Sequence, residues 1–257
     1  MSGSVLDFGE ARASAGGCPF GLCDGSGFVV DEQTNTASDC RCRAQRIARR
    51  RAAALEARIP NRYRSLSFEQ LEGGELSGFD GQLQMIRNFA RQIASNVDQG
   101  RSLRIVGDVG TGKTSLAMLI SKAALDAGKT VAIYSLPRLL ALIREAIERE
   151  EGVVGFLERL SLVDLLHIDD VGAENQTDWA LEQLYTIVNT RYEEQRSILL
   201  TTNLKEDELT DQLGERIVSR LIEMCGDNFV PLYGEDRRRP SSIGSVREAA
   251  DFPQTFR

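Results

Sequence analysis

The fold is decided by one stretch of the sequence, Gly107-Asp108-Val109-Gly110-Thr111-Gly112-Lys113-Thr114-Ser115. An apolar run, Leu103-Arg104-Ile105-Val106, precedes it, and residues 113–127, rich in Ala and Leu, are predicted to form a helix. Glycines let successive backbone N–H groups converge on an anion, and the start of the helix adds its positive end. Strand, loop and helix together predict a P-loop that binds the phosphates of ATP.

Two side chains of this loop are predicted to act on the nucleotide. Lys113 is spaced to reach the β- and γ-phosphates, and the hydroxyl of Thr114 to ligate Mg²⁺. The residues from Gly107 to Ser115 are expected to cradle the phosphates through backbone N–H groups. A chance glycine turn is the alternative, but the flanking strand and helix argue against it.

Two adjacent acids end another apolar run. Residues 162–168 are predicted to form a strand, and Asp169 and Asp170 follow it directly. A P-loop needs an acid at the end of a neighbouring buried strand to hold Mg²⁺, and Asp169 is expected to be that acid rather than part of a solvated turn. Asp170 is predicted to polarise the attacking water, with Glu174 in reserve. Aspartate is one methylene shorter than the glutamate common there, so slow turnover is expected.

Asn203 ends the strand predicted at 197–202. An amide at this place can orient a water near the γ-phosphate, and a simple turn residue is the alternative. His167 is the single histidine of the chain. Because it lies in the middle of a strand, it is expected to be a core residue rather than a catalyst.

Strands and helices are predicted to alternate from about residue 80 onward. The expected strands are 103–106, 130–134, 162–168 and 197–202, and the expected helices are 82–98, 113–127, 136–149 and 177–195. Such alternation is typical of an α/β fold, with a parallel sheet covered by helices on both faces. Two helical stretches between Pro137 and Leu160 form an insertion before Asp169.

Composition indicates a soluble globular protein. Of 257 residues, 42% are hydrophobic and 27% are charged, which is ordinary for that class. No apolar run approaches the ~20 residues that span a bilayer, and the N-terminus lacks the pattern of a secretory signal. We therefore expect a cytoplasmic protein without a membrane partner, whose thiols stay reduced. The net charge of −7 argues against indiscriminate nucleic-acid binding but permits a local basic site.

Four of the five cysteines lie near the N-terminus, at Cys18, Cys23, Cys40 and Cys42. Two close pairs of thiolates in a reducing compartment suit a tetrahedral Zn²⁺. A closed four-ligand set predicts a structural ion, on which so short a module would depend to fold. An iron–sulfur cluster and unpaired buried thiols are the alternatives. Cys225 lies far away and is expected to be a buried apolar residue.

A basic stretch follows the cysteines. Nine arginines and a single acid lie between Arg41 and Arg64, and residues 43–58 contain neither Gly nor Pro, which predicts a helix. Three interpretations stay open: contact with nucleic-acid phosphates, an adaptor face for an acidic protein surface, and a solvated face.

Several segments between residues 58 and 240 keep a recognisable order and spacing. They are Arg58-Ile59-Pro60-Asn61-Arg62-Tyr63, residues 166–174, Trp179, Tyr185, Arg191-Tyr192 and Leu200-Thr201-Thr202-Asn203-Leu204. Together they resemble the DnaC/DnaI replicative helicase loaders, AAA+ ATPases of the clade that also contains DnaA and IstB. The resemblance implies an AAA+ core and an ATP-dependent loader that binds a hexameric replicative DNA helicase and delivers it onto single-stranded DNA.

The resemblance also implies roles for three arginines. Arg220 matches the arginine finger that acts on the ATP of an adjacent subunit, with Arg216 a neighbour, which implies self-association. Pairing of these arginines with Glu215 and Glu223 is the alternative. Arg238 would sense the γ-phosphate, although Arg237 and Arg239 beside it prevent a firm choice. The extra helix of the insertion would steer how subunits stack, and a plain crossover is the alternative.

These expectations divide the chain into five parts. They are a disordered N-terminus (1–17), a four-cysteine zinc module (18–42), a basic helix or linker (43–60), an AAA+ ATPase domain (61–236) and a C-terminal tail (237–257). Zinc modules at the N-termini of some DnaI-like and phage loaders imply that 18–42 docks on the helicase. An IstB-like transposition helper on duplex DNA and a non-hydrolysing ATP-switched adaptor are the alternative functions.

Overall fold

The computed structural model describes residues 18–31, 34, 36–44, 46–47, 59–72, 78–147, 152–172, 177–234 and 236. The predicted α/β class is confirmed by a parallel sheet of five strands. Their order is β4 (Val131–Ser135), β5 (Leu165–Val171), β6 (Ser197–Thr202), β3 (Leu103–Gly107) and β7 (Phe229–Leu232). Every neighbouring pair is parallel. The carboxyl ends of all five strands therefore meet at one edge of the sheet.

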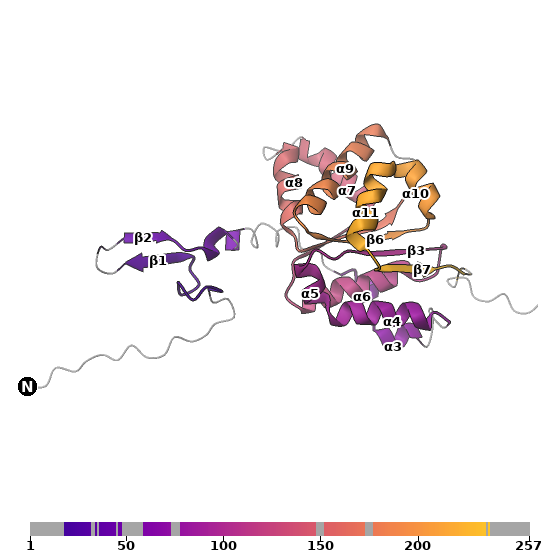
Figure 1. Cartoon of the computed structure of the whole chain (residues 1–257), viewed down its shortest axis with the longest axis horizontal. Helices are drawn as coiled ribbons and strands as arrows, with labels where there is room; N and C mark the ends of the chain where they lie inside the picture. The colour runs from indigo at the N-terminus through magenta and orange to yellow at the C-terminus, as the bar shows by residue number, and fades with distance from the viewer. Residues whose placement is uncertain are drawn as a thin grey trace, which may run out of the picture.

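Helices cover both faces of this sheet (Figure 1). One face carries α4 (Asp80–Arg91), α5 (Ile93–Asp98) and α6 (Lys113–Asp126), with the short α2 (Asn61–Arg64) and α3 (Phe68–Glu72) packed beside them. The other face carries α7 (Leu136–Ile147), α8 (Gly152–Leu162), α9 (Asp178–Glu193), α10 (Glu206–Leu213) and α11 (Glu215–Cys225). Among the described helices, none has the length and apolar character needed to cross a bilayer.

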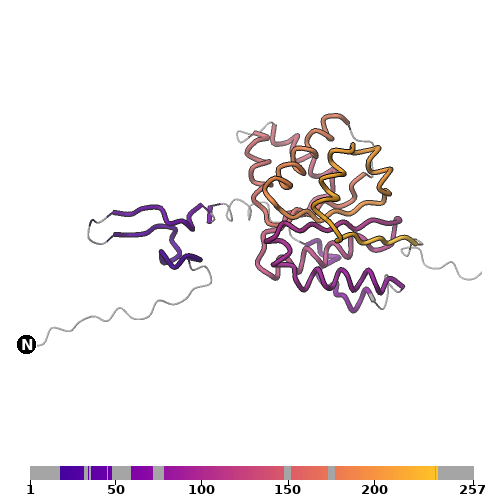
Figure 2. The backbone as a smooth tube through the Cα atoms, in the orientation of Figure 1, coloured from indigo at the N-terminus to yellow at the C-terminus, as the bar shows by residue number. Residues whose placement is uncertain are grey.

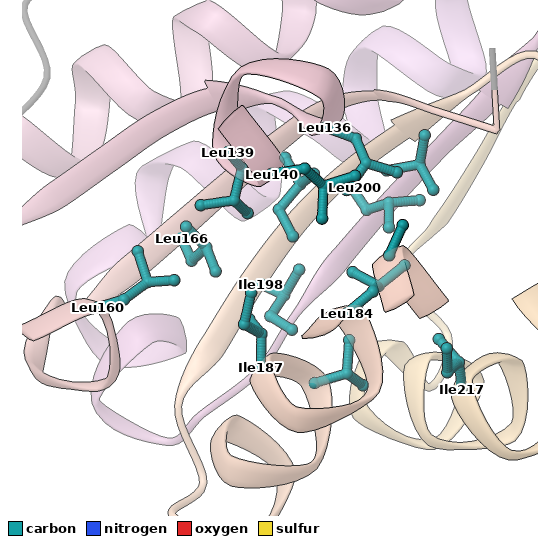
Figure 3. Packing of buried hydrophobic residues seen from close by; sticks show 14 of the residues in the cluster. Leu136, Leu139, Leu140, Leu160, Leu166, Leu184, Ile187, Ile198, Leu200 and Ile217 are labelled. Atoms are coloured by element: carbon teal, nitrogen blue, oxygen red, sulfur yellow. The ribbon is translucent and has the colours of Figure 1, made fainter. Parts of the chain in front are cut away.

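Two apolar cores hold the three layers together. Figure 3 shows the core under α7–α11, where Leu139, Leu166, Ile198 and Ile217 meet between helices and sheet. A second core lies under α4–α6. Each fully buried Leu or Ile contributes about 1.5–3 kcal/mol relative to an exposed side chain. Both cores share the sheet, so apolar side chains pack against each face of its strands. This packing fixes the position of the carboxyl ends of the strands.

A buried arginine ties three elements together at the opposite edge of the sheet. Arg191 of α9 is 1% exposed, and it donates to the carbonyl oxygens of Leu160 (3.0 Å), Val163 (3.0 Å), Asp164 (3.2 Å) and Ser197 (2.8 Å). Burial, and then the charge of Arg196, lower the pKa of Arg191 to about 9. These carbonyls belong to the end of α8, the following loop and the start of β6. One guanidinium therefore links these three segments by hydrogen bonds.

The structure differs from the predicted elements at several points. The helix expected at 82–98 breaks at Gln92 into α4 and α5, because Gln92 leaves helical geometry at φ −103° and ψ 16°. The strand expected at 162–168 begins only at Leu165, and Leu162 still belongs to α8. The strand β7 was not predicted at all. Figure 2 shows this last strand running beside β3, with which it pairs from Arg104 onward.

Candidate nucleotide and metal sites

The P-loop lies between β3 and α6, as the sequence predicts. The strand β3 ends at Gly107, α6 begins at Lys113, and Gly110 and Gly112 take φ values of 81° and 90°. The Thr111 hydroxyl braces the turn by donating to the carbonyl oxygen of Asp108 at 2.8 Å. Positive φ values favour glycine, and they let the loop fold around an anion at the helix start.

Lys113 is folded over the backbone of its own loop. Its Nζ donates to the carbonyl oxygens of Gly107 (2.8 Å) and Asp108 (2.7 Å), and the residue is only 7% exposed. A buried ammonium must keep such partners because desolvation is costly. The same Nζ therefore lies next to the part of the loop that would bind an anion.

A pocket of about 330 Å³ opens at the carboxyl edge of the sheet. Nine residues predicted for the nucleotide line it: Val109, Gly110, Gly112, Lys113, Thr114, Ser115, Asp169, Asp170 and Asn203. The other predicted loop residues, Gly107, Asp108 and Thr111, form the backbone turn that supports this wall. Three lining residues, Arg62, Tyr63 and Thr201, were not predicted for the site. Position could have suggested Thr201, because it lies at the end of β6, two residues before Asn203.

The Asp169 carboxylate lies against the first turn of α6. The Thr114 hydroxyl is 3.1 and 3.2 Å from its two oxygens, and the Thr201 hydroxyl donates to Oδ1 at 2.6 Å. Burial of this carboxyl opposes its ionisation. The His167 imidazole and the two threonine hydroxyls outweigh that effect and hold the pKa of Asp169 below its usual range. A hydroxyl and an ionised carboxylate in contact are the oxygen donors that Mg²⁺ prefers.

A β-bulge brings the second acid into the same pocket. Alternation along a strand would turn Asp169 and Asp170 to opposite faces. The register of β5 on β6 shifts between Ile168 and Val171, and Asp170 takes a left-handed φ of 60°. The Asp170 N–H donates to the Thr201 hydroxyl at 2.8 Å, which fixes the bulge. Both carboxylates consequently line the pocket, with Asp170 exposed to it.

The strand β7 closes the back of the P-loop. The Asp108 N–H donates to the Leu232 carbonyl at 3.1 Å, and the Gly234 N–H donates to the Asp108 carboxylate at 2.8 Å. A Cβ on Gly107 would stand 1.8 Å from the Leu232 oxygen, so only glycine fits there. The loop is therefore held by a segment far along the chain, as the 126-residue separation of Asp108 and Gly234 shows.

The arginines assigned to the finger region lie on α11. Arg220 packs against its own chain, with its guanidinium 5.2 Å from the Tyr185 ring and 5.7 Å from the Tyr192 ring, and it donates to the Arg216 carbonyl. Arg216 is exposed. Neither arginine reaches the pocket of its own chain. The expected positions of Glu174, Arg237, Arg238 and Arg239 lie outside the described residues.

The four N-terminal cysteines converge on one point. The Sγ atoms of Cys18 and Cys40 are 3.6 Å apart, those of Cys23 and Cys42 are 3.5 Å apart, and all four lie within 4.8 Å of one another. A tetrahedral Zn²⁺ with ~2.3 Å bonds to sulfur needs sulfur atoms about 3.8 Å apart. The hairpin of β1 (Phe28–Asp31) and β2 (Thr36–Asp39) carries the second pair to the first. The cluster thus fits a single metal ion.

Comparison with known proteins agrees with this geometry. The chain is 31% identical to the Escherichia coli protein YdaV over 150 residues, covering 58% of this chain and 60% of YdaV. It is 28% identical to XkdC of a Bacillus subtilis phage-like element over 206 residues, 76% of this chain and 74% of XkdC. It is also 28% identical to the replicative helicase loader DnaC of Escherichia coli over 173 residues, 66% of each. The match spans less than two thirds of YdaV and of DnaC.

The fold of the core is similar to the solved structures of DnaC and DnaI. The crystal structure of the DnaC helicase loader matches with a TM-score of 0.59 and 26% identity, over 67% of this chain and 99% of that one. DnaI matches with a TM-score of 0.57 and 22% identity, over 73% of this chain and 100% of that one, which shows the fold. Residues 43–239 match the model of the family described as IstB-like ATP binding protein. The chain therefore belongs to the IstB-like ATP-binding proteins, within the AAA+ clade that includes DnaA and DnaC.

Proposed function

We propose that this protein is an ATP-dependent loader that binds a hexameric replicative DNA helicase and delivers it onto single-stranded DNA. One observation carries the proposal: an AAA+ pocket with a P-loop and two acids occurs in one chain with a four-cysteine module. The similarity to DnaC supports the same role. The proposed location of the protein is the cytoplasm.

The pocket supports binding of ATP with Mg²⁺. Loop N–H groups and Lys113 would hold the phosphates, and Thr114 and Asp169 would hold the cation. Their fit rests on the contact between the Thr114 hydroxyl and both Asp169 oxygens. When bound, Mg²⁺ supplies charge that stabilises the phosphates. Asp170 would accept a proton from the attacking water, and Asn203 would orient that water.

Hydrolysis by this arrangement should be slow. Aspartate at 170 reaches less far than glutamate would, although the bulge compensates by turning the carboxylate into the pocket. In the proposed cycle, Arg220 of one subunit completes the site of the next, so that ATP promotes self-association. Its stacking on Tyr185 and Tyr192 supports a resting position from which the side chain must be released.

The cysteine module is proposed to hold structural Zn²⁺ and to grip the helicase. The sulfur spacing suits one ion better than the several irons of a cluster. Side chains exposed around the cluster include Phe20 (46%), Leu22 (50%) and Val30 (64%), as a protein-binding face requires. We propose that the zinc module comprises residues 18–42 and the AAA+ domain residues 61–236.

Helicase loading is the experiment that tests the proposal. The protein is mixed with a replicative helicase and a DNA bubble, and helicase bound to the single strand is measured with ATP, ADP or no nucleotide. The proposal requires a helicase contact and loading that depends on ATP. If the chain neither contacts a helicase nor stimulates its loading, the loader function is excluded.

The family match favours a second candidate, an IstB-like transposition helper that coats duplex DNA. Nucleotide-dependent DNA binding separates the two, because a loader prefers single strands and the helper forms filaments on duplex. Binding is compared at two salt concentrations, since phosphate contacts weaken steeply with salt. A chain that is indifferent to nucleotide on both substrates would instead be a protein adaptor.

A further inference from the structure

The single histidine of the chain lies directly beneath the proposed cation site. His167 is fully buried, at 0% exposure, on the strand β5. Its Nδ1 is 3.0 Å from the Ser121 hydroxyl of α6, and its Nε2 is 3.8 Å from Oδ1 of Asp169. Among the described residues, no hydrogen-bond partner lies within range of Nε2. A polar atom buried without a partner is costly, so its position calls for an explanation.

The alternation of β5 explains why the imidazole and the carboxylate face the same way. His167 and Asp169 are two residues apart on a strand, so both point towards α6. Along α6, Thr114 and Ser121 are seven residues apart, about two helical turns, and share one face. Ser121 meets His167, and Thr114 meets Asp169. Ser121, the imidazole, the carboxylate and Thr114 therefore follow one another along α6, with 3.8 Å between the imidazole Nε2 and the carboxylate Oδ1.

The partners of the imidazole determine its tautomer. Nε2 lies 3.8 Å from a carboxylate oxygen of Asp169, which can only accept a hydrogen bond when ionised. A proton on Nε2 turns this approach into an attraction, whereas a lone pair there would face a negative oxygen. A neutral imidazole carries one N–H, so Nδ1 must then accept from the Ser121 hydroxyl. Ser121 thereby keeps the N–H of His167 directed at Asp169.

We propose that His167, fixed by Ser121, is a positioning residue that holds the Asp169 carboxylate for the cation of the nucleotide site. This inference rests on the proposed ATP and Mg²⁺ site. The Nε2–H faces Oδ1 at 3.8 Å and attracts it electrostatically, while the Thr201 hydroxyl donates a hydrogen bond to the same oxygen at 2.6 Å. The hydrogen bond from Thr201 and the attraction of the N–H both favour the carboxylate orientation that faces Thr114. Partners of this kind behind a metal ligand typically change metal affinity about 10–100-fold.

Three substitutions test this role. His167→Leu removes the N–H donor and keeps a buried apolar side chain. His167→Gln restores an N–H donor in the same direction and is the matched control. Ser121→Ala leaves the imidazole in place but removes the hydroxyl that fixes its tautomer. Thermal unfolding without nucleotide shows for each variant whether the fold survives.

The measurement is the Mg²⁺ dependence of binding of a fluorescent ATP analogue, without turnover. We expect His167→Leu to raise the Mg²⁺ concentration at half-saturation about tenfold, with His167→Gln close to wild type and Ser121→Ala in between. Affinity for the analogue in EDTA should change less than about twofold in all three, because the imidazole acts only through the cation ligand. If His167→Leu does not fold, the Ser121→Ala shift decides the question alone.

Two outcomes contradict the role. A Mg²⁺ midpoint indistinguishable from wild type in His167→Leu, or in Ser121→Ala where only that variant folds, makes the histidine a plain core residue. Equal loss of affinity with and without Mg²⁺ assigns it to the fold of the pocket rather than to the cation. If the wild type shows no Mg²⁺ dependence, the proposed nucleotide site fails and this inference fails with it.

Discussion

At the scale of single residues, Lys113 is the side chain on which nucleotide binding should depend most. Its Nζ is buried against two loop carbonyls, from which it can turn to a phosphate. Charge-assisted hydrogen bonds contribute about 1.5–3 kcal/mol each. Lys113→Ala should therefore weaken ATP binding about 100-fold, measured by equilibrium binding.

Lys129 provides a matched control for that substitution. It is a lysine just past the end of α6 whose ion pair with Asp98 lies at the surface. Such pairs contribute less than about 1 kcal/mol. Lys129→Ala should bind ATP as the wild type does. Equal affinity of the two variants would mean that Lys113 does not contact the nucleotide.

Asp170 separates binding from hydrolysis. Asparagine tolerates the left-handed backbone found at this position, with φ 60°, but cannot accept a proton from water. We expect Asp170→Asn to bind ATP within about twofold of wild type and to lose hydrolysis about 100-fold, as for removal of a general base. Phosphate release measures the rate. Unchanged hydrolysis would assign the general base to another residue.

At the scale of elements, Arg191 should be the strongest single tie between α8, the loop that follows it and β6. Its removal leaves carbonyls of Leu160, Val163 and Ser197 buried without a donor. We expect Arg191→Leu to lower the free energy of unfolding by about 3–5 kcal/mol, measured by urea denaturation. Arg196→Leu is the control, because the Arg196 side chain is 35% exposed and its ion pair with Asp164 is long, at 3.5 Å. A similar loss of unfolding free energy in both variants would contradict this role of Arg191.

Elements with strong local signals could be predicted from the sequence, and those fixed by distant contacts could not. The strand Ser197–Thr202 matches its predicted bounds, because an apolar run between polar turns leaves one choice. Phe229–Leu232 is short and contains Pro231, and it becomes a strand through its pairing with β3. The bulge at Asp170 likewise depends on Thr201, which the sequence places 31 residues away. The lining residues Arg62 and Tyr63 carry no phosphate-site motif.

At the scale of the whole molecule, the cysteine module and the AAA+ core should respond separately to loss of metal. A Zn²⁺ bound by four thiolates stabilises a small module by about 10–16 kcal/mol of apparent binding energy. We expect one zinc per wild-type chain, none in Cys40→Ser, and ATP affinity within about twofold in both. Elemental analysis and nucleotide binding measure this. Cys225→Ala is the control, since that buried thiol lies in the core. Zinc retained by Cys40→Ser would exclude the four-ligand site.

The trans finger can be tested by mixing two inactive proteins. Arg220→Ala keeps an intact pocket but lacks the finger, and Asp170→Asn keeps the finger but lacks the base. In a head-to-tail oligomer, each pocket meets the finger of the next subunit. Random mixing in equal amounts then forms a complete site at about a quarter of the interfaces. Each variant alone should hydrolyse ATP poorly, and the mixture should recover activity that rises with protein concentration.

The structure gives this test a specific alternative. Arg216 is exposed, whereas Arg220 rests on Tyr185 and Tyr192 of its own chain. If Arg216→Ala complements Asp170→Asn and Arg220→Ala retains hydrolysis, the finger is Arg216 and Arg220 is an internal brace. If no mixture recovers activity, neither arginine acts as a finger on the pocket of another chain. ATP would then not promote assembly through α11, and the proposed loader would act without the oligomer.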